Sequence, residues 1–558
     1  MVKKFLQFLY KDTPRLHEAA YLLGFFSILS HVLGFVRDRL LAHIFGASLE
    51  LDIYYAAFRI PDFLFVTVAS MVSLSVLVPF IVEREKDGRE AVREFINNIF
   101  SFFSIIIFIT CILVFVFMPE ISKFLFKGFT VSELSQVNFL SRILLISPIA
   151  LGFSNLFGSL TQAFNRFTVY ALAPLIYNST IILAILLLTK SMGITGVAIG
   201  VALGACFHAL IQVPFVIKAG FCPRPSLSFN FDSIKRVVSL SLPRTLTLST
   251  SHIATIFLVA MASLMPDGSI SIFSFSVNIQ MFPLSIIGVS YSLAAFPTLS
   301  RHFANNNLKA FTDQMSTTAR HIIFWIVPIT ALVVVLRAQI VRVLLGTGEF
   351  SWDATRLTAA AVALFVLSSV FQSLVLLFTR GFYSAGYTKR PFILNLFSMG
   401  ILVASSYVLV DIFYAHEGFR LFITTLLKVG DLSNTVVLML PLAFTLGTVV
   451  NGVLHWVDFE RHFKGFSKEV GRTLFNALGA GVIMGAVSYA GLLLFAPVFD
   501  TTSLMGIFLQ GFLAGIVGIL SGVGVLYLLK SRELYETWQT LHAKFWKTDV
   551  IATDPEIA

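Results

Sequence analysis

Residues Ser30 to Gly46 read S-H-V-L-G-F-V-R-D-R-L-L-A-H-I-F-G, within a run that is almost wholly apolar from Ala19 onward. The run is long enough for a helix that crosses a bilayer, because about 20 apolar residues span the hydrocarbon. It nevertheless carries Arg37, Asp38 and Arg39. A charge at mid-membrane costs about 2.5–3.5 kcal/mol even on the lenient insertion scale, so it normally faces protein or water. The stretch therefore indicates a membrane helix with protein or a water-filled cavity beside it.

The composition is that of an integral membrane protein. Of the 558 residues, 57% are hydrophobic and 13% are charged, and the mean hydropathy is +0.86. Soluble globular proteins carry about 25% charged residues. Lys11 and Asp12 interrupt the apolar patch at 5–10, so we expect no cleavable signal peptide. The three cysteines form no C-x-x-C pair, and we expect them to be small apolar packing residues.

Fourteen segments are apolar and long enough to cross the membrane, so we expect an all-α integral membrane protein. Their approximate bounds are 20–45, 53–81, 97–118, 137–164, 170–189, 194–217, 238–264, 271–300, 321–341, 355–385, 392–411, 433–456, 474–495 and 503–529. With a cytoplasmic N-terminus, the inner segments hold 26 Lys or Arg residues and the outer loops hold 6. This asymmetry predicts that both termini are cytoplasmic. It also explains the formal net charge of +10 without a nucleic-acid partner.

Eight basic residues remain inside the predicted spans, and all of them are arginines. Four lie near span ends, where we expect the side chains to snorkel to the headgroups: Arg142, Arg337, Arg356 and Arg380. The others are Arg37, Arg39, Arg59 and Arg244. Three of these four lie on the first two spans, which makes those spans the candidate functional region.

The sequence also contains an internal repeat. The pattern P-x-x-x-N at 174–178 recurs at 391–395, an offset of 217 residues. Pro79 has a counterpart in Pro297, at an offset of 218 residues. The offset corresponds to six spans, an even number, so the two halves keep the same orientation. Parallel repeats of this kind are typical of transporters with a substrate site between the halves.

No motif for catalysis or metal binding is apparent. G-T-G-E-F at Gly346 lacks the Gly-Lys-Ser/Thr of a phosphate loop, and S-G-V-G-V at Ser521 lies inside the last span. The eleven histidines show no H-E-x-x-H spacing. The longest loops have about twenty residues, too few for an enzymatic domain. We expect neither an enzyme nor a cofactor or metal.

The charges of the first span separate by their positions around the helix. Ser30 and Arg37 fall on one stripe, and His31 and Asp38 fall on the adjoining one. Arg39 is about 200° from Arg37, so both cannot face the same cavity. One interpretation is a structural pair of Asp38 with either arginine, or an arginine that snorkels. The other is a guanidinium that binds an anion, for which phosphate has the best geometry.

The next span begins L-D-I-Y-Y-A-A-F-R-I-P-D. Asp52 and Arg59 are seven residues apart, and therefore lie on one helical face. Asp52 could equally cap the N-terminus of its own helix, the commoner role for such a residue. For Arg59, a cavity position and snorkelling remain equal alternatives.

These two spans resemble the signature of the MurJ (MviN) family, the lipid II flippases of the multidrug/oligosaccharidyl-lipid/polysaccharide (MOP) exporter superfamily. The likeness covers residues 20–530 and includes N-R-F at Asn165, A-P-L-I-Y-N at Ala173, F-P-T-L-S at Phe296 and G-F-Y-S-A-G-Y-T-K-R-P at Gly381. The resemblance implies transport of undecaprenyl-pyrophosphate-linked peptidoglycan precursor from the inner to the outer leaflet by alternating access. It implies a place in the bacterial inner membrane and a role in cell-wall biogenesis and cell shape.

The resemblance also implies two parallel six-helix lobes around a central cavity, plus two C-terminal helices that form a groove for the lipid tail. The corresponding divisions are a cytoplasmic amphipathic segment at 1–19, an N-lobe at 20–219, a C-lobe at 220–456, groove helices at 457–530 and a cytoplasmic tail at 531–558.

In the family pattern, the Arg of R-D and the Asp before the aromatic pair are functionally important, and they match Arg37 and Asp52. His31 and Asn278 stand where the family usually has arginine, and F-L-F-V-T-V-A-S-M-V at 63–72 replaces the usual L-R-R segment. Each hydrogen bond to a charged group contributes about 1.5–3 kcal/mol, so these losses should weaken a pyrophosphate site.

The resemblance implies that Arg37 binds the pyrophosphate. We expect the substrate-binding residues to be Ser30, His31, Arg37, Arg244 and Asn278. Arg244 would supply a second cation, and His31 would supply a pH-dependent one. We expect the gating and coupling residues to be Asp38, Asp52 and Arg59. The membrane potential should assist the cycle, while the coupling ion stays open.

Two alternative functions remain. One is a related exporter of another polyprenyl-linked glycan, or a drug antiporter, which the missing arginines favour. The other is a non-transporting scaffold whose partners are cell-wall synthesis proteins.

Overall fold

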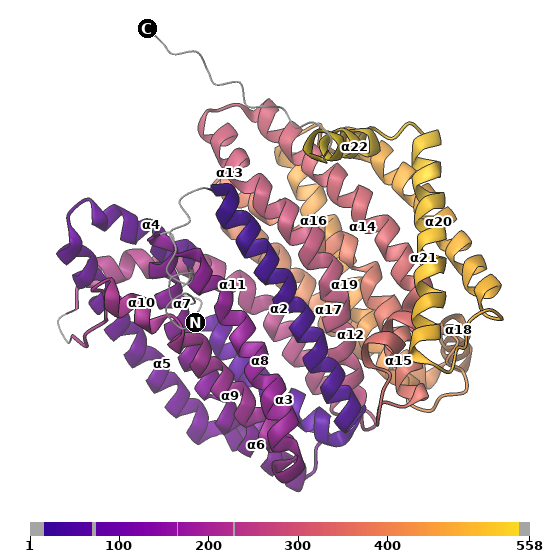
Figure 1. The fold of residues 1–558 in the computed structure, drawn as a ribbon, viewed down its shortest axis with the longest axis horizontal. Coiled ribbons are helices and arrows are strands. Elements are labelled where there is room, and N and C mark those ends of the chain that lie inside the picture. The colour runs from indigo at the N-terminus through magenta and orange to yellow at the C-terminus, as the bar shows by residue number, and fades with distance from the viewer. Residues whose placement is uncertain (1–15, 70–73, 165, 227–228, 546–558) are drawn as a thin grey trace. The chain divides into compact units, whose positions relative to one another are not determined.

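The computed structural model describes residues 16–69, 74–164, 166–226 and 229–545. Across these ranges the chain is helical and contains no β-strand. Figure 1 shows the helices as ribbons coloured along the chain. The predicted all-α architecture is therefore confirmed for the described residues.

The stretch from Ser30 forms the end of α2 (Leu16–Phe45). α3 (Leu49–Thr67) follows after a short turn. Gly46 in this turn has a φ of +65°, which L side chains rarely adopt. A Cβ there would lie 2.6 Å from the carbonyl oxygen of Glu349, so close packing also requires glycine. Ser48 caps α3, because its side chain accepts a backbone hydrogen bond from the first turn.

The other helices follow in chain order. The first group is α4 (Leu74–Glu85), α5 (Arg89–Leu125), α6 (Val131–Leu144), α7 (Ile146–Ala163), α8 (Phe167–Met192), α9 (Ile194–Leu210) and α10 (Val213–Lys218). The second group is α11 (Phe231–Ala262), α12 (Ser269–Pro283), the π-helix η2 (Leu284–Val289), α13 (Ser290–Ala304), α14 (Leu308–Leu345), α15 (Trp352–Leu367), α16 (Ser369–Ser384) and α17 (Lys389–Ala415). The last group is α18 (Glu417–Leu427), the 3-10 helix η3 (Thr435–Leu438), α19 (Met439–His462), α20 (Phe466–Phe495), α21 (Leu504–Leu528) and α22 (Arg532–Phe545).

In the described part of the chain, 12 helical segments are long and apolar enough to cross a membrane. The predicted number of fourteen is therefore not confirmed. The segments 20–45 and 53–81 are the predicted spans that do not appear among the 12. α2 covers the first of them, whereas the second is divided between α3 and α4, and residues 70–73 lie outside the description.

Several other predicted spans also consist of more than one helix. The segment 137–164 is divided at Leu145, and the segment 355–385 is divided at Ser368. The hydroxyl of Ser368 donates to the carbonyl oxygen of Phe365 at 2.6 Å. Such a local bond competes with the helical hydrogen-bond ladder and accompanies bends. Hydropathy averaged over the length of a span does not show these divisions.

The chain divides into two compact units. The first contains residues 1–276, 344–361 and 388–443, and the second contains residues 277–343, 362–387 and 444–558. Each unit is a set of segments that pack together. The predicted lobe boundaries at 219 and 456 stay predictions.

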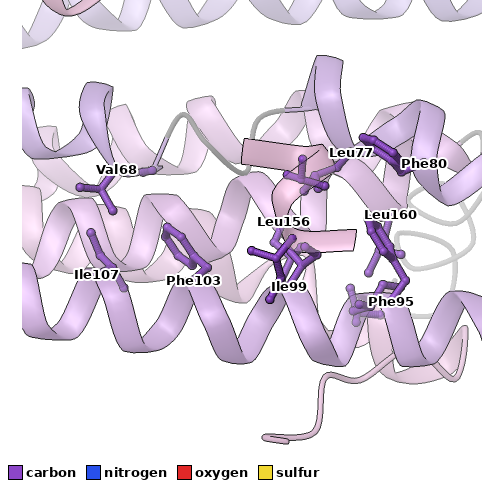
Figure 2. Packing of buried hydrophobic residues seen from close by; sticks show 14 of the residues in the cluster. Val68, Leu77, Phe80, Phe95, Ile99, Phe103, Ile107, Leu156 and Leu160 are labelled. Atoms are coloured by element: carbon purple, nitrogen blue, oxygen red, sulfur yellow. The ribbon is translucent and has the colours of Figure 1, made fainter. Parts of the chain in front are cut away.

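The core of the first unit lies where α5 packs against α7. The buried residues on this face of α5 are Phe95, Ile99, Phe103 and Ile107. Figure 2 shows them gathered with Leu156 and Leu160 of α7. Gly152 of α7 allows the close approach, since a Cβ there would lie 2.4 Å from the ring of Phe103.

In the second unit, α20 and α21 lie side by side (Figure 1) and pack through glycines. A Cβ on Gly518 of α21 would lie 1.8 Å from the Oγ of Ser488 on α20. A Cβ on Gly522 would lie 2.5 Å from the Cε of Met484. Small residues let helix backbones approach closely in a membrane. The lipid-tail groove predicted for these helices stays a prediction.

Candidate functional site

The candidate site lies in the first compact unit and is built by α2, α3, α8, α11 and α12. α2 packs against α8, and α3 packs against α11. The helices carry charged and polar side chains within otherwise apolar segments. Buried polar groups need hydrogen-bond partners, so these side chains fix how the helices fit together.

Arg37 and Asp38 form an ion pair on neighbouring positions of α2. The Nη2 and Nε atoms of Arg37 donate to the Oδ1 of Asp38 at 2.8 and 3.0 Å. The structural pair, one of the two interpretations of these residues, is therefore present. The exposed fraction is 25% for the Arg37 side chain and 7% for Asp38. Asp38 thus holds the guanidinium in place, while a quarter of the Arg37 side chain stays exposed.

Asn178 of α8 connects this pair to Ser30, which lies two turns earlier on α2. The Nη1 of Arg37 donates to the Oδ1 of Asn178 at 3.4 Å, and the Nδ2 of Asn178 donates to the Oγ of Ser30 at 3.2 Å. The structure thus brings Ser30, Arg37 and Asp38 together. Asn178 is not among the predicted site residues, although it ends the repeated P-x-x-x-N pattern. That repeat is the signal that could have identified it.

His31 and Arg39 occupy other positions on α2. His31 is exposed and Arg39 is half-buried. Arg39 lies about 200° around the helix from Arg37, given 3.6 residues per turn. The predicted role of His31 as a pH-dependent cation stays a prediction.

Asp52, in the first turn of α3, binds the start of α12. The side chain is buried, and the residue is only 3% exposed. Its carboxylate accepts hydrogen bonds from the N–H of Gly268 at 2.8 Å and from the N–H and Oγ of Ser271 at 2.7 and 2.5 Å. The N-cap of α3 is Ser48, so the alternative in which Asp52 caps its own helix is wrong. A carboxylate at the N-terminus of another helix satisfies otherwise unpaired N–H groups and is attracted by the helix dipole.

Two glycines with positive φ allow close packing against the end of α2 and the turn that follows it. Gly268 has a φ of +86°, and a Cβ there would lie 2.5 Å from the carbonyl oxygen of Ala47. Gly348 has a φ of +59°, and a Cβ there would lie 2.2 Å from the carbonyl oxygen of His43. The G-T-G-E-F segment that contains Gly348 therefore packs against the end of α2.

Arg59 also binds α12, and it does not pair with Asp52 in this structure. Its Nη2 donates to the Oγ of Ser274 at 2.9 Å. In the described part of the chain, the Nε of Arg59 and the hydroxyl of Tyr55 are buried without a hydrogen-bond partner. Asp52 and Arg59 thus hold α3 against α12 at successive turns, and unused donors remain between them.

Arg244 and Asn278 cannot be placed in this cluster. Arg244 belongs to α11, but its side chain lies outside the described residues. Asn278 lies one turn after Ser274 in α12 and belongs to the second compact unit. The substrate-binding roles of both residues stay predictions.

A further ion pair joins α3 to α11. The Nδ1 of His252 lies 3.3 Å from the Oδ2 of Asp62, and the side chains are 34% and 33% exposed. Asp62 follows Tyr55 and Arg59 at helical spacing, so all three share one side of α3. Neither His252 nor Asp62 is among the predicted site residues. No spacing in the sequence connects His252 with α3, so only the fold reveals this pair.

Comparison with known proteins identifies similar sequences over most of the chain. A family model described as "Lipid II flippase MurJ" matches residues 41–510. A probable lipid II flippase MurJ of Buchnera aphidicola is 25% identical over 404 residues, which cover 72% of this chain and 78% of the relative. A probable lipid II flippase MurJ of Haemophilus influenzae is 26% identical over 391 residues, which cover 67% of this chain and 77% of the relative.

Solved structures share the fold. A lipid II flippase MurJ in an inward closed conformation aligns with a TM-score of 0.70 at 23% identity, covering 93% of this chain and 99% of that one. An inward-facing multidrug resistance MATE family transporter of the MOP superfamily aligns with a TM-score of 0.63 at 14% identity. The alignment covers 79% of this chain and 96% of that one. These likenesses confirm the predicted all-helical transporter fold.

Proposed function

Since the chain belongs to the MurJ family of lipid II flippases, we propose that it moves lipid II from the inner to the outer leaflet by alternating access. It is a multi-pass protein of the bacterial inner membrane and a transporter rather than a catalyst. The observation that carries the proposal is the cluster of Arg37, Asp38 and Asn178 within apolar helices.

Arg37 is the proposed ligand for the pyrophosphate of the lipid. Its guanidinium is planar and can donate two parallel hydrogen bonds to phosphate oxygens. Asp38 occupies one edge through Nε and Nη2, so the pyrophosphate would approach the Nη1 edge, where the bond to Asn178 is long at 3.4 Å. Asp38 therefore orients the guanidinium, and it also weakens anion binding enough for release on the far side.

Asp52 is the proposed gate. It holds α3, from the first predicted half of the chain, against α12, from the second. If the halves rock during alternating access, these hydrogen bonds break when the cavity opens on the side of the membrane where Asp52 lies. Arg59 and Ser274 form a second contact between the same helices, deeper in the membrane. Both termini would lie in the cytoplasm, which puts the gate at the outer surface.

A related exporter of another polyprenyl-linked glycan is the second candidate. The specific observation that favours it is the loss of family arginines at His31, Asn278 and the segment 63–72. Such a substrate keeps the lipid and the pyrophosphate, so Arg37 would have the same role in both cases. Cell-wall synthesis proteins would be partners under either function.

The test is a flipping assay with fluorescent lipid II in proteoliposomes, with and without an imposed membrane potential. We expect wild-type flipping and at least a tenfold loss for Arg37→Ala, because hydrogen bonds to a charged group contribute about 1.5–3 kcal/mol each. Arg37→Lys should keep the charge but lose the paired donors, and give an intermediate rate.

Arg142→Ala is the matched control, because Arg142 lies at a helix end where its side chain contacts Phe115. It should flip at the wild-type rate. Wild-type protein that flips another polyprenyl-pyrophosphate glycan but not lipid II would establish the second candidate instead.

A further inference from the structure

The pair of His252 and Asp62 joins two helices at membrane depth. Asp62 lies 13 residues into α3, which is about 20 Å from the start of the helix at 1.5 Å per residue. His252 lies 10 residues before the end of α11, about 15 Å from that end. A hydrocarbon core is about 30 Å thick, so both positions fall near its middle. Ionisable residues there are rare and usually functional.

The pair is partly exposed on the protein surface. Each side chain is about one-third exposed, at 34% for His252 and 33% for Asp62. An ion pair with that much free surface in the middle of a membrane is stable only where it faces a polar space. Histidine is the side chain that ordinarily changes its charge between about pH 5 and 8. The pair therefore places an ionisable imidazole beside Asp62.

The other charged or titratable groups near α11 lie on α3, α17 and α4. On α3, Arg59 is one turn from Asp62 and binds Ser274. On α17, Tyr407 meets α11 at Phe257, more than a turn from His252. The charged residues of α4 reach α11 only at its cytoplasmic end, where Arg84 binds Ser233 and Glu83 lies 3.7 Å from Arg236.

The remaining neighbours of His252 lie further along α11 and on α5. The side chain of Arg244, two turns along α11, lies outside the described residues. From α5, which also packs on α11, the contact is made by the amide of Asn98 to the carbonyl oxygen of Asn230, at the same cytoplasmic end. These contacts of α11 with α4 and α5 thus lie away from the pair.

We propose that His252 and Asp62 form a proton-binding site that couples flipping to proton movement. A proton from water on one side of the membrane binds the imidazole, and the pair changes from a net charge of −1 to a neutral ion pair that holds α3 to α11. When the proton leaves to the other side, Asp62 loses its partner and the helices can part. The inference rests on the proposed function, because α3 and α11 fall in the two lobes that the sequence predicts to alternate.

The first experiment measures flipping of fluorescent lipid II in proteoliposomes under pH gradients of either direction. We expect one direction to accelerate wild-type flipping at least threefold over no gradient. His252→Gln should flip at a rate that does not respond to either gradient. His252→Lys, a permanent cation, should keep α3 and α11 paired and flip slowly at every pH. His416→Gln removes an exposed histidine and should respond like wild type.

The second experiment does not depend on flipping. Inorganic pyrophosphate is added to purified protein in weakly buffered detergent solution near pH 7, and proton exchange is read with a pH-sensitive dye. We expect wild type and His416→Gln to exchange a measurable fraction of one proton per protein, and His252→Gln and Asp62→Asn to exchange none.

The outcomes separate the two proposals. Wild-type flipping that ignores pH gradients, with equal proton exchange in wild type and His252→Gln, would overturn the coupling site and leave the flippase intact. Absent flipping with His252-dependent proton exchange would overturn the flippase and keep the site.

Discussion

The carboxylate of Asp52 accepts three hydrogen bonds from the first turn of α12, two of them from backbone N–H groups. Mutation cannot remove the backbone donors, so the carboxylate is the partner to change. Asp52→Asn keeps the size of the side chain and replaces an ionised acceptor by an amide. We expect the contact between α3 and α12 to weaken by about 1.5–3 kcal/mol, the contribution of a hydrogen bond to a charged group.

Labelling of Ser269→Cys by a membrane-impermeant maleimide measures this change, in a background where the native cysteines are replaced by alanine. Ser269 is 1% exposed, so it reacts only when the contact opens. The open population should rise about 10- to 100-fold in Asp52→Asn, at 1.4 kcal/mol per factor of ten. Asp267→Asn, an exposed carboxylate of the same loop, is the control and should change nothing. Equal labelling of both variants would argue against a gate.

At this scale the sequence identifies charges but not their partners. Arg37, Asp38 and Asp52 are visible because a charge in an apolar run needs an explanation. Asn178 is marked only by the repeated P-x-x-x-N pattern, and Ser274 by nothing, because uncharged polar residues are common in helices and their partners lie on other helices. The partner of Asp52 is the start of α12, and Gly268 there is 216 residues further along the chain. Packing decides such pairs, and no local pattern encodes them.

At the scale of elements, two glycines of α21 give opposite expectations for the same change. A Cβ on Gly518 would overlap the Oγ of Ser488 and reach 3.0 Å from the carbonyl oxygen of Met484, whereas nothing lies within 4 Å of one on Gly524. Gly518→Ala should therefore lower the free energy of unfolding by about 1–3 kcal/mol, as overpacking does. Gly524→Ala should be neutral or raise it by up to about 1 kcal/mol through helix propensity.

Thermal unfolding of the two variants in nanodiscs provides the comparison. A lower unfolding temperature for Gly518→Ala alone supports tight glycine packing between α20 and α21. If Gly524→Ala were the more destabilising of the two, this account of the pair would be wrong.

The C-terminal helix α22 is held by a buried carboxylate. Glu533 is 3% exposed and accepts hydrogen bonds from the Oγ1 of Thr473 at 2.6 Å and the Oγ of Ser531 at 2.9 Å. The Nη1 of Arg320 lies 3.6 Å from it. Burial alone would raise the pKa of Glu533, but these hydrogen bonds and the charge of Arg320 lower the pKa below its ordinary value.

The direction of that shift fixes the pH dependence. A carboxyl whose pKa is lower in the folded state stabilises the protein above the unfolded pKa, about 4.3, and the effect is lost as pH falls through the folded pKa. A spin label at Gln539→Cys should therefore be immobile at pH 7 and become mobile below about pH 4. Glu533→Gln should make it mobile already at pH 7, whereas the exposed Glu469→Gln should not. A label that stays immobile in Glu533→Gln would exclude this anchor.

Hydropathy predicts the long spans and misses the short or divided elements. α18, at Glu417–Leu427, is too short to cross a membrane, so an analysis by span length treats it as loop. The segment that follows it is held by Arg356, which makes two hydrogen bonds of 2.6 Å to Asp431 and one of 2.7 Å to the carbonyl oxygen of Lys428. The divided second span escapes prediction for the opposite reason, because α3 and α4 together have the length of one helix.

At the scale of the whole molecule, charge asymmetry predicts an orientation that the fold leaves open. A helix bundle has the same internal contacts whichever way it is inserted, so orientation depends on the loops. The predicted inner segments contain most of the Lys and Arg residues, 26 against 6 in the outer loops. The positive-inside rule then places the exposed Cys222 in the cytoplasm. Thr501, in the loop between α20 and α21, falls on the outer side and is also exposed.

A membrane-impermeant maleimide applied to intact cells tests this orientation. Cys222 should react only after the membrane is permeabilised, because the reagent cannot reach the cytoplasm. Thr501→Cys, in a variant with Cys222 replaced by serine, should react in intact cells. The buried Cys111 should react in neither state, and it reports whether the protein has unfolded. The opposite pattern for Cys222 and Thr501→Cys would invert the orientation. It would then place the Asp52 gate on the cytoplasmic side, where it would control entry of the lipid rather than its release.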